Sequence, residues 1–219
     1  MIVVTGDGFA AASYANSNYS WCAQDQNHLI QGLLPHPANI PYSFAAHLSK
    51  VFHQPYICNA CEIYSSNRVF EIANTFIDSG VDILVVVFPA LFKNHIMYQG
   101  KAYYYRIDDV ESADHPPEIL KLIIEQYKQT NLTVIYNQFD QNLSQLCNKL
   151  AKTKTKYCLV MGESNLKTHP NIGNWLLDPS LFHIRAWAKS NNLLNEKQFL
   201  TKQGQIELAK LITKHLTSK

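Results

Sequence analysis

The sequence predicts an α/β fold in which a mostly parallel, five-stranded sheet lies between two layers of helices, a three-layer sandwich. Short apolar runs alternate about five times with stretches whose apolar residues recur every three or four positions. One of these runs, Asp82–Phe88, is an unbroken series of aliphatic and aromatic residues after its first position, which is typical of a central parallel strand buried on both faces. The length of 219 residues suits one domain.

The predicted strands are short and apolar, and turn residues or a helical pattern follow most of them. They lie within Met1–Phe9 and at Tyr56–Cys58, Asp82–Phe88, Leu132–Tyr136 and Tyr157–Met161. The helices are predicted from apolar periodicity and from capping residues at their starts. They cover Pro41–Phe52, the stretch from Ser65 or Ser66 to Gly80, a segment that starts at Pro116 and Pro117, Leu143–Leu150, Ser180–Lys189 and about Thr201–Leu216.

The first strand ends in a Thr-Gly-Asp-Gly turn, because glycine permits the backbone angles of a tight exit. In open α/β sheets the loops that leave the carboxyl ends of the strands form the binding crevice. Residues that follow the first, second and fifth strands are therefore expected on the rim of that crevice. The predicted binding rim consists of Asp7, Gly8, Ser66, Asn67 and Ser164.

Two irregular stretches interrupt the pattern, at about residues 10–39 and 89–114, and we expect them as insertions in a single domain of residues 1–219. Both contain tyrosines, and the first also contains Trp21. Amphipathic aromatic side chains with few charges favour contact with a protein partner, with a second copy of the chain or with carbohydrate. A loop folded over its own rings has the same composition, so both interpretations stay open.

Composition excludes several functional classes. Charged residues make up 16% of the chain and the formal net charge is +2, with no basic stripe, which disfavours nucleic acid. No run approaches the roughly 18 apolar residues of a membrane span, so no membrane association is expected. The first strand has neither a basic leader nor a cleavage site, which indicates no signal peptide and a cytoplasmic location.

Five cysteines, an odd number, mostly lie in apolar runs and indicate reduced, packed thiols. Cys58 and Cys61 have the spacing of a redox or zinc motif, but no second cysteine pair or histidine pair completes it. Gly6 to Gly8 do not form a phosphate-binding loop by themselves, which leaves nucleotide binding as a weak third hypothesis. We therefore expect no metal and no cofactor.

Several blocks, in order, resemble those of the SGNH (GDSL) hydrolases. They are Gly-Asp-Gly-Phe at 6–9, Asn59-Ala60, Ser65-Ser66-Asn67-Arg68, the strand that starts at Asp82, and Phe199-Leu200-Thr201 before Gly204. The likeness is greatest to SGNH-like proteins of bacteria and bacterial viruses. This likeness implies an SGNH or flavodoxin-like sandwich. It also implies that the protein could be part of, or associated with, a viral particle.

The family hydrolyses esters with a serine nucleophile, a histidine base and an aspartate that orients the histidine. By resemblance, the serine position falls on Gly8, the histidine on Phe199 and the aspartate on Glu196. The oxyanion glycine falls near Tyr64, and residues 88–92 lack the oxyanion asparagine, with Asn94 a little beyond. The resemblance therefore implies a catalytically degenerate protein, a binding or structural module.

The alternative is an esterase that has relocated its catalytic groups and acts on small esters or O-acetylated carbohydrate. Ser66 and Ser164 are the candidate nucleophiles on the predicted rim, and His95 and His183 are the candidate bases. The structural interpretation of the same residues is a helix cap, a turn serine and two packing or surface histidines. Asp7 is expected to secure its own turn rather than to act as a base.

Overall fold

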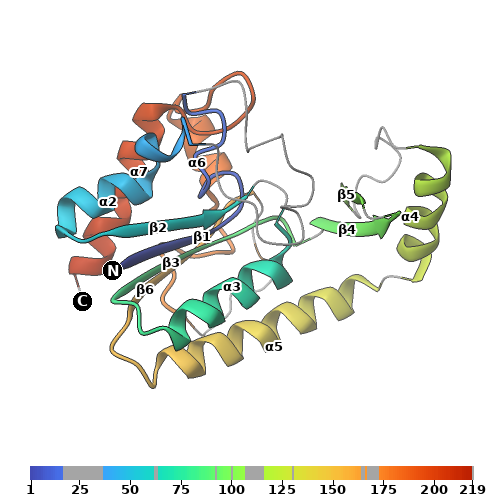
Figure 1. Cartoon of the computed structure of the whole chain (residues 1–219), viewed down its shortest axis with the longest axis horizontal. Helices are drawn as coiled ribbons and strands as arrows, with labels where there is room; N and C mark the ends of the chain where they lie inside the picture. The colour runs from blue at the N-terminus through green and yellow to red at the C-terminus, as the bar shows by residue number, and fades with distance from the viewer. Residues whose placement is uncertain are drawn as a thin grey trace.

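A computed structural model describes residues 1–16, 37–61, 64–91, 93–99, 101–106, 116–129, 131–163, 166 and 173–218. Its central feature is a parallel sheet with helices on both faces, which confirms the predicted α/β sandwich (Figure 1). The helices α2, α6 and α7 cover one face, and α3 and α5 cover the other. Their bounds are Phe44–Phe52 (α2), Ser66–Asp78 (α3), Leu132–Leu150 (α5), Ile184–Ser190 (α6) and Lys202–Thr217 (α7).

The sheet has four strands in the order β2-β1-β3-β6, and all its pairings are parallel. The strands are Ile2–Gly6 (β1), Tyr56–Ala60 (β2), Ile83–Phe88 (β3) and Lys156–Met161 (β6). Every residue of β1 and β3 is buried, as expected for central strands that are covered on both faces. The carboxyl ends of all four strands lie at one edge, where Gly6 is level with Ala60 and Val87.

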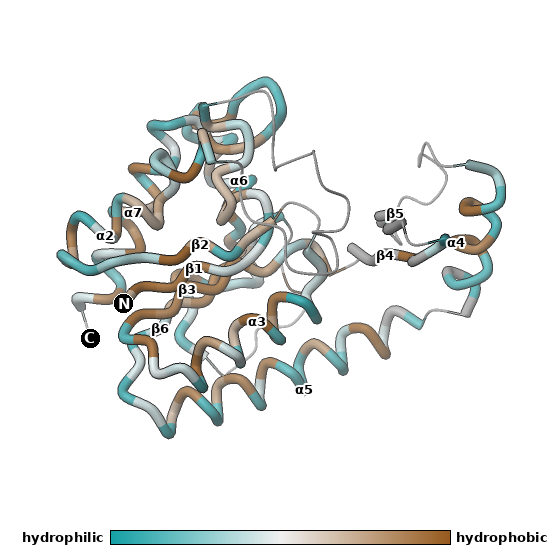
Figure 2. The backbone as a smooth tube through the Cα atoms, viewed as in Figure 1, coloured by the Kyte–Doolittle hydropathy of each residue, from teal (hydrophilic) through white to brown (hydrophobic). Residues whose placement is uncertain are grey.

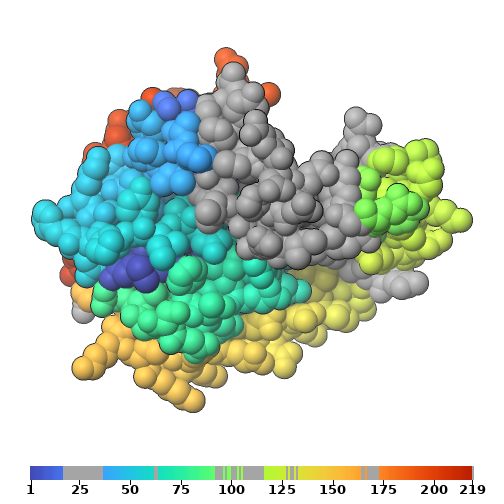
Figure 3. All heavy atoms as spheres, viewed as in Figure 1, coloured from blue at the N-terminus to red at the C-terminus, as the bar shows by residue number. Residues whose placement is uncertain are grey.

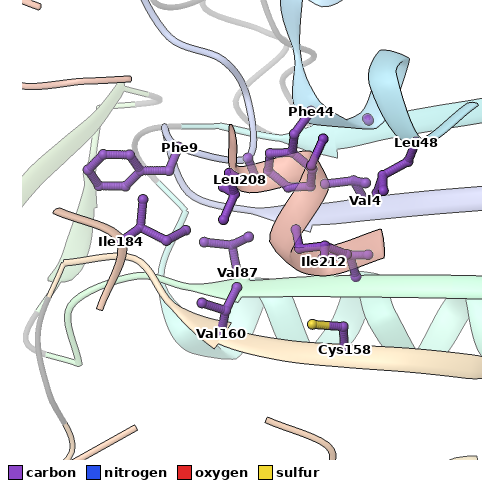
Figure 4. Packing of buried hydrophobic residues seen from close by; sticks show 14 of the residues in the cluster. Val4, Phe9, Phe44, Leu48, Val87, Cys158, Val160, Ile184, Leu208 and Ile212 are labelled. Atoms are coloured by element: carbon purple, nitrogen blue, oxygen red, sulfur yellow. The ribbon is translucent and has the colours of Figure 1, made fainter. Parts of the chain in front are cut away.

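Alternate residues of each strand contact alternate helical layers, because successive side chains of a strand point to opposite faces. On one face, Val4, Val87 and Val160 pack against Leu208 and Ile212 of α7, with α2 and α6 completing the layer (Figure 4). Val3, Leu84 and Leu159 point to the other face and pack against α3 and α5. Figure 2 shows the result, a band of apolar strands between helices with polar outer surfaces.

The predicted fifth strand is wrong: Leu132–Tyr136 forms the first turns of α5 and belongs to no sheet. Its β-branched run suggested a strand, but Asn131 caps a helix here, since its side-chain oxygen accepts a hydrogen bond from Thr133 N at 2.8 Å. Ile135 packs on two separate cores, whereas Val134 is 57% exposed. Tertiary packing along a continuous amphipathic helix thus overrides local β-propensity.

The stretch predicted as irregular at 89–114 contains an antiparallel hairpin, β4 (Lys93–Tyr98) and β5 (Lys101–Arg106). Gln99 in the connecting turn has a φ of 49°, the left-handed conformation that two-residue hairpin turns require. Helix α4 (Pro117–Gln129) packs on this hairpin through Ile119 and Ile123, in a small third core. Figure 3 shows the hairpin and α4 at the end of the molecule opposite to α2.

Side-chain caps fix where the helices begin. Ser43, Ser65 and Thr201 each accept a hydrogen bond from a backbone N–H of the first turn of α2, α3 and α7. The sequence left Ser65 and Ser66 as alternative caps for α3, and the structure selects Ser65, whose Oγ accepts from Arg68 N. The Ser66 hydroxyl is consequently not used in capping.

One buried side chain connects three parts of the fold that are distant in sequence. Gln205, in the first turns of α7, is fully buried. Its Oε1 accepts a hydrogen bond from Phe44 N of α2 at 2.9 Å, and its Nε2 donates to the carbonyl of Phe9, after β1, at 3.2 Å. Since buried backbone groups are costly to leave unpaired, Gln205 holds the exit of β1 against both helices.

We expect Gln205→Ala to destabilise the fold by about 2–3 kcal/mol, because the Phe44 N–H would lose its buried acceptor. Urea denaturation followed by circular dichroism measures the change. Gln203→Ala is the matched control in the same helix, because Gln203 is exposed and its loss is expected to cost less than about 0.5 kcal/mol. Equal effects of the two substitutions would contradict the role of Gln205.

Candidate functional site

The turn after β1 lies at the carboxyl edge of the sheet, as predicted, but it is buried. Residues 7–13 are all inaccessible to solvent. Asp7 secures the turn, because its Oδ1 accepts a hydrogen bond from Phe9 N at 2.9 Å. The chain then makes a further turn, in which Ser13 N donates to the carbonyl of Gly8 at 2.9 Å. Asp7 and Gly8 therefore lie beneath the predicted rim rather than on its surface.

The space beside Gly8 is occupied by an aromatic ring. A Cβ atom built on Gly8 would lie 2.4 Å from Cε1 and 3.1 Å from Cζ of Phe199, and 3.1 Å from Ser13 Oγ. No side chain fits at position 8 unless Phe199 moves. The two residues that the resemblance predicts at the nucleophile and base positions are thus adjacent, and the Phe199 ring fills the space beside Gly8.

Phe199 is held in a cluster of aromatic side chains. Its ring centroid lies 5.4 Å from that of Phe9 and 5.3 Å from that of Tyr14, both in tilted geometry. The guanidinium carbon of Arg185, in α6, lies 5.5 Å from the Phe9 ring centroid and 5.9 Å from that of Phe199. Cation–π and ring–ring contacts of this kind each contribute on the order of 1 kcal/mol.

Arg185 also pairs with Glu163, which follows β6. Arg185 Nη2 lies 3.3 Å from Glu163 Oε1, and the Glu163 side chain is only 5% exposed. The backbone N–H of Arg185 donates to the carbonyl of Gly162 at 3.0 Å. Position 162 is itself restricted to glycine, because a Cβ there would lie 2.1 Å from Oδ2 of Asp7. The exits of β1 and β6 are therefore packed directly against each other.

Glu196, at the family's aspartate position, is exposed. It lies in a tight loop that Asn195 organises, since Asn195 Oδ1 accepts hydrogen bonds from Lys197 N and Phe199 N. Asn195 Nδ2 also donates to the carbonyl of Tyr14, which ties this loop to the turn after β1. The loop thus presents the Phe199 ring inward, while the carboxylate at position 196 lies at the surface.

Ser66 lines a small pocket of about 80 Å³ at the start of α3, together with the predicted rim residue Asn67. Its Oγ is buried and has no hydrogen-bond partner among the described residues. The other lining residues are Ser65, Leu91, Ile135, Gln138 and Phe139. No imidazole or carboxylate belongs to this described lining, so the described part of the pocket holds no general base beside Ser66.

The two candidate histidines lie in different elements of the fold, His183 at the start of α6 and His95 in β4. His183 caps α6, because its Nδ1 accepts from Ala186 N at 3.3 Å, and it also bonds the backbone of Gly162. Burial lowers the pKa of His183, opposed in part by the Gly162 hydrogen bond. His95 lies in β4, opposite Tyr104, and its side chain lies outside the described part of the chain. Ser164 is also outside the described residues.

The residues that the resemblance predicts at or near the oxyanion positions include two buried aromatic side chains. Tyr64 is 6% exposed and its hydroxyl donates to Asn59 Oδ1 at 3.2 Å. Phe88, at the end of β3, packs against Phe70 and Phe139 with ring centroids about 5 Å apart. The backbone of Asn94 lies in β4, and its side chain is outside the description.

The described cysteines are structural in character. Burial raises the pKa of the Cys58 thiol to about 12 and that of Cys147 to about 11, so both stay protonated near neutral pH. Cys58 Sγ lies 3.2 Å from the carbonyl oxygen of Ala10. Among the described residues no group of three or more histidine, cysteine, aspartate or glutamate side chains could hold a metal ion. No described helix has the length and apolar character to cross a membrane.

The sequence alone did not predict Arg185, Glu163 and Ser13 as residues of this site. Arg185 contacts Phe9 and Phe199 and pairs with Glu163, three residues that lie far from it along the chain. No local pattern signals such contacts. Ser13 lies in a stretch without periodicity, and only the turn after Gly8 brings its hydroxyl beside that glycine.

We expect Gly8→Ala to destabilise the protein by about 1–3 kcal/mol, because the new methyl group overlaps the Phe199 ring. The backbone at Gly8 is not in the left-handed region, so the overlap is the main cost. In a Phe199→Leu background, which lacks the Cε1 and Cζ atoms, the cost of Gly8→Ala should fall by at least about 1 kcal/mol. Urea denaturation of all four proteins measures this coupling, and an additive result would contradict the contact.

We expect the pH dependence of stability to include His183. Because its folded pKa lies below the ordinary value of 6.5, the unfolded chain binds the proton more readily, and stability falls as pH decreases through about 6.5. His183→Asn keeps a capping acceptor and removes the titration, so its unfolding free energy should change less between about pH 7 and pH 5. A slope as steep as that of the parent protein would contradict this assignment. His47, whose pKa burial also lowers, remains in both proteins.

No family model and no curated protein matches the chain. Solved structures do. A carbohydrate esterase family 2 enzyme with a carbohydrate-binding domain from Corynascus thermopiles (Myceliophthora fergusii) aligns at a TM-score of 0.50 and 9% identity, over 99% of this chain and 65% of that one. A G-D-S-L family protein from Desulfitobacterium hafniense aligns at 0.46 and 10%, over 98% of both chains. A carbohydrate esterase described for divergent catalytic and non-catalytic binding functions aligns at 0.47 and 13%, over 100% of this chain and 68% of that one. The parallel sheet, its two helical layers and the alignment at a TM-score of 0.50 together show that the chain has an SGNH-hydrolase-like fold.

Proposed function

We propose that this protein is a non-hydrolytic member of the SGNH-like fold and acts as a binding or structural module. One observation supports this proposal above all. The Phe199 ring occupies the space beside Gly8, where an SGNH hydrolase is expected to hold its serine. A packed aromatic contact thus stands in the place of a nucleophile and its base.

Ester hydrolysis by this fold needs a hydroxyl, an imidazole and an open approach for the substrate. Gly8 carries no side chain, and Phe199 cannot accept a proton. Ser13 Oγ is the described hydroxyl nearest to Gly8, but Ser13 is fully buried beneath the aromatic cluster. In a serine protease the loss of the nucleophile or the base lowers kcat by about a million-fold, so the same losses here favour an inactive site.

The relocated-esterase hypothesis has less support. Ser66 has an unpartnered hydroxyl in a pocket, but the described lining of that pocket contains only neutral groups. A serine without a base keeps its proton at neutral pH and is a poor nucleophile. The geometry therefore favours a helix-start serine in a small polar pocket over a catalytic serine.

The segments outside the sandwich, the β4–β5 hairpin and α4, are candidates for a binding role. The hairpin β4–β5 and α4 have a core of their own and lie at one end of the molecule, joined to the sandwich through α5. Aromatic side chains such as Tyr98 and Tyr103 are only partly buried there. The resemblance to SGNH-like proteins of bacterial viruses supports a component of a viral particle as one setting, with a protein or carbohydrate as the partner.

Hydrolysis of p-nitrophenyl acetate and labelling by a fluorophosphonate test the proposal. The purified protein is expected to show no turnover above the uncatalysed rate and no covalent label, because no serine with an adjacent base is found among the described residues of the site. Ser66→Ala is expected to give the same results as the parent protein. An active SGNH esterase in the same assay provides the positive control.

Turnover that Ser66→Ala or Ser164→Ala abolishes would overturn the proposal and establish a relocated site. Labelling of the parent protein that mass spectrometry maps to either serine would do the same. Thermal denaturation of each variant shows whether the fold is retained, so that loss of activity is not confused with unfolding.

A further inference from the structure

A surface groove lies between α2 and α7, in the outer helical layer and away from the turn at Gly8. The two helices pack side by side (Figure 1). The groove has a volume of about 550 Å³. Residues 206, 209, 210, 213, 214 and 217 line its α7 side, and residues 47, 50 and 51 line its α2 side. Positions three and four apart form one stripe along each helix, so the groove follows the helix axes.

The floor of the groove is apolar or small. Ile206 and Ala209 lie on α7, and Val51 of α2 is 52% exposed. Thr213 and Thr217 continue the stripe with short side chains, which allow another backbone to approach. At 1.5 Å per residue the α7 stripe is about 16 Å long, which matches roughly three turns of a helix laid along it.

The charges at the groove are all of one sign. Lys50, Lys210 and Lys214 line it, and no aspartate or glutamate is among its lining residues. Glu207 pairs with Lys210 at 2.9 Å, but Lys50 and Lys214 have no ion-pair partner in the described part of the chain. Burial lowers the pKa of His47, and the nearby Lys50 ammonium lowers it further.

We propose that the α2–α7 groove binds an acidic amphipathic helix of a partner protein. An apolar stripe with cationic edges complements a helix that carries leucine-like residues on one face and carboxylates on its flanks. Ridges of such a helix fit between two packed helices. This surface is separate from the Gly8 site, so the inference goes beyond the proposed function and does not depend on the absence of hydrolysis.

The probe is a synthetic helical peptide of about 18 residues, with leucine on one face and glutamate on the other. Fluorescence anisotropy is expected to show saturable binding with a Kd below about 100 µM. Backbone resonances of Val51 and Ala209 should shift in nuclear magnetic resonance spectra. A peptide of the same composition in scrambled order, and one with lysine in place of glutamate, should bind at least about tenfold more weakly.

Charge and apolar contact can be removed separately. Lys50→Glu with Lys214→Glu should weaken binding by about tenfold or more, since two attractive contacts become repulsive. Val51→Ser should weaken it by about threefold, because it exposes less apolar surface to the peptide. Lys152→Glu with Lys154→Glu is the matched control: the same charge reversal at two exposed loop lysines should leave the Kd unchanged.

Four results would overturn the proposal. They are no saturable binding at about 1 mM peptide, equal binding of the scrambled peptide, an unchanged Kd in the Lys50→Glu and Lys214→Glu protein, or an unchanged Kd for Val51→Ser. Preferential binding to vesicles of phosphatidylglycerol, lost in the same lysine variant, would assign the groove to an anionic membrane surface instead. Circular dichroism of each variant confirms that the helices are retained.

Discussion

Burial of β1 on both faces is the constraint from which the site geometry follows. The strand lies between β2 and β3, and α2 and α7 cover one of its faces while α3 covers the other. Residues 7–13, which follow the strand, are buried as well. Buried backbone groups there need internal partners, and for Phe9 the Asp7 carboxylate accepts from the N–H while the Gln205 amide donates to the carbonyl.

The same constraint gives Gly8 and Phe199 their relationship. In a hydrolase of this fold, a polar pair at these positions requires access to water and substrate. Here Gly8 has no side chain, and the Phe199 ring occupies the space beside it. Phe9, Tyr14 and Arg185 contact that ring. The ring therefore closes the space beside Gly8 by packing. Arg185 also pairs with the Glu163 side chain, which is only 5% exposed, so an ion pair lies at the same edge of the sheet.

The outer surfaces are less constrained than the interior. At one end, β4, β5 and α4 form a small core that the sheet does not require, and α5 connects it to the sandwich. Near the other end, α2 and α7 leave a cationic groove between them. Because function depends on sites rather than on topology, one fold can carry separate surfaces at its two ends.

The sequence by itself determined the layer architecture, the parallel strands β1, β2, β3 and β6, and most helices, since apolar periodicity and caps are local signals. The resemblance also predicted Gly8 and Phe199 at the nucleophile and base positions. The tertiary structure alone decided that these two residues touch, that Glu196 is exposed and that Arg185 pairs with Glu163, because contacts between distant segments leave no local pattern. It likewise decided that Leu132–Tyr136 is helical, since packing on two cores outweighs the preference of a short β-branched run.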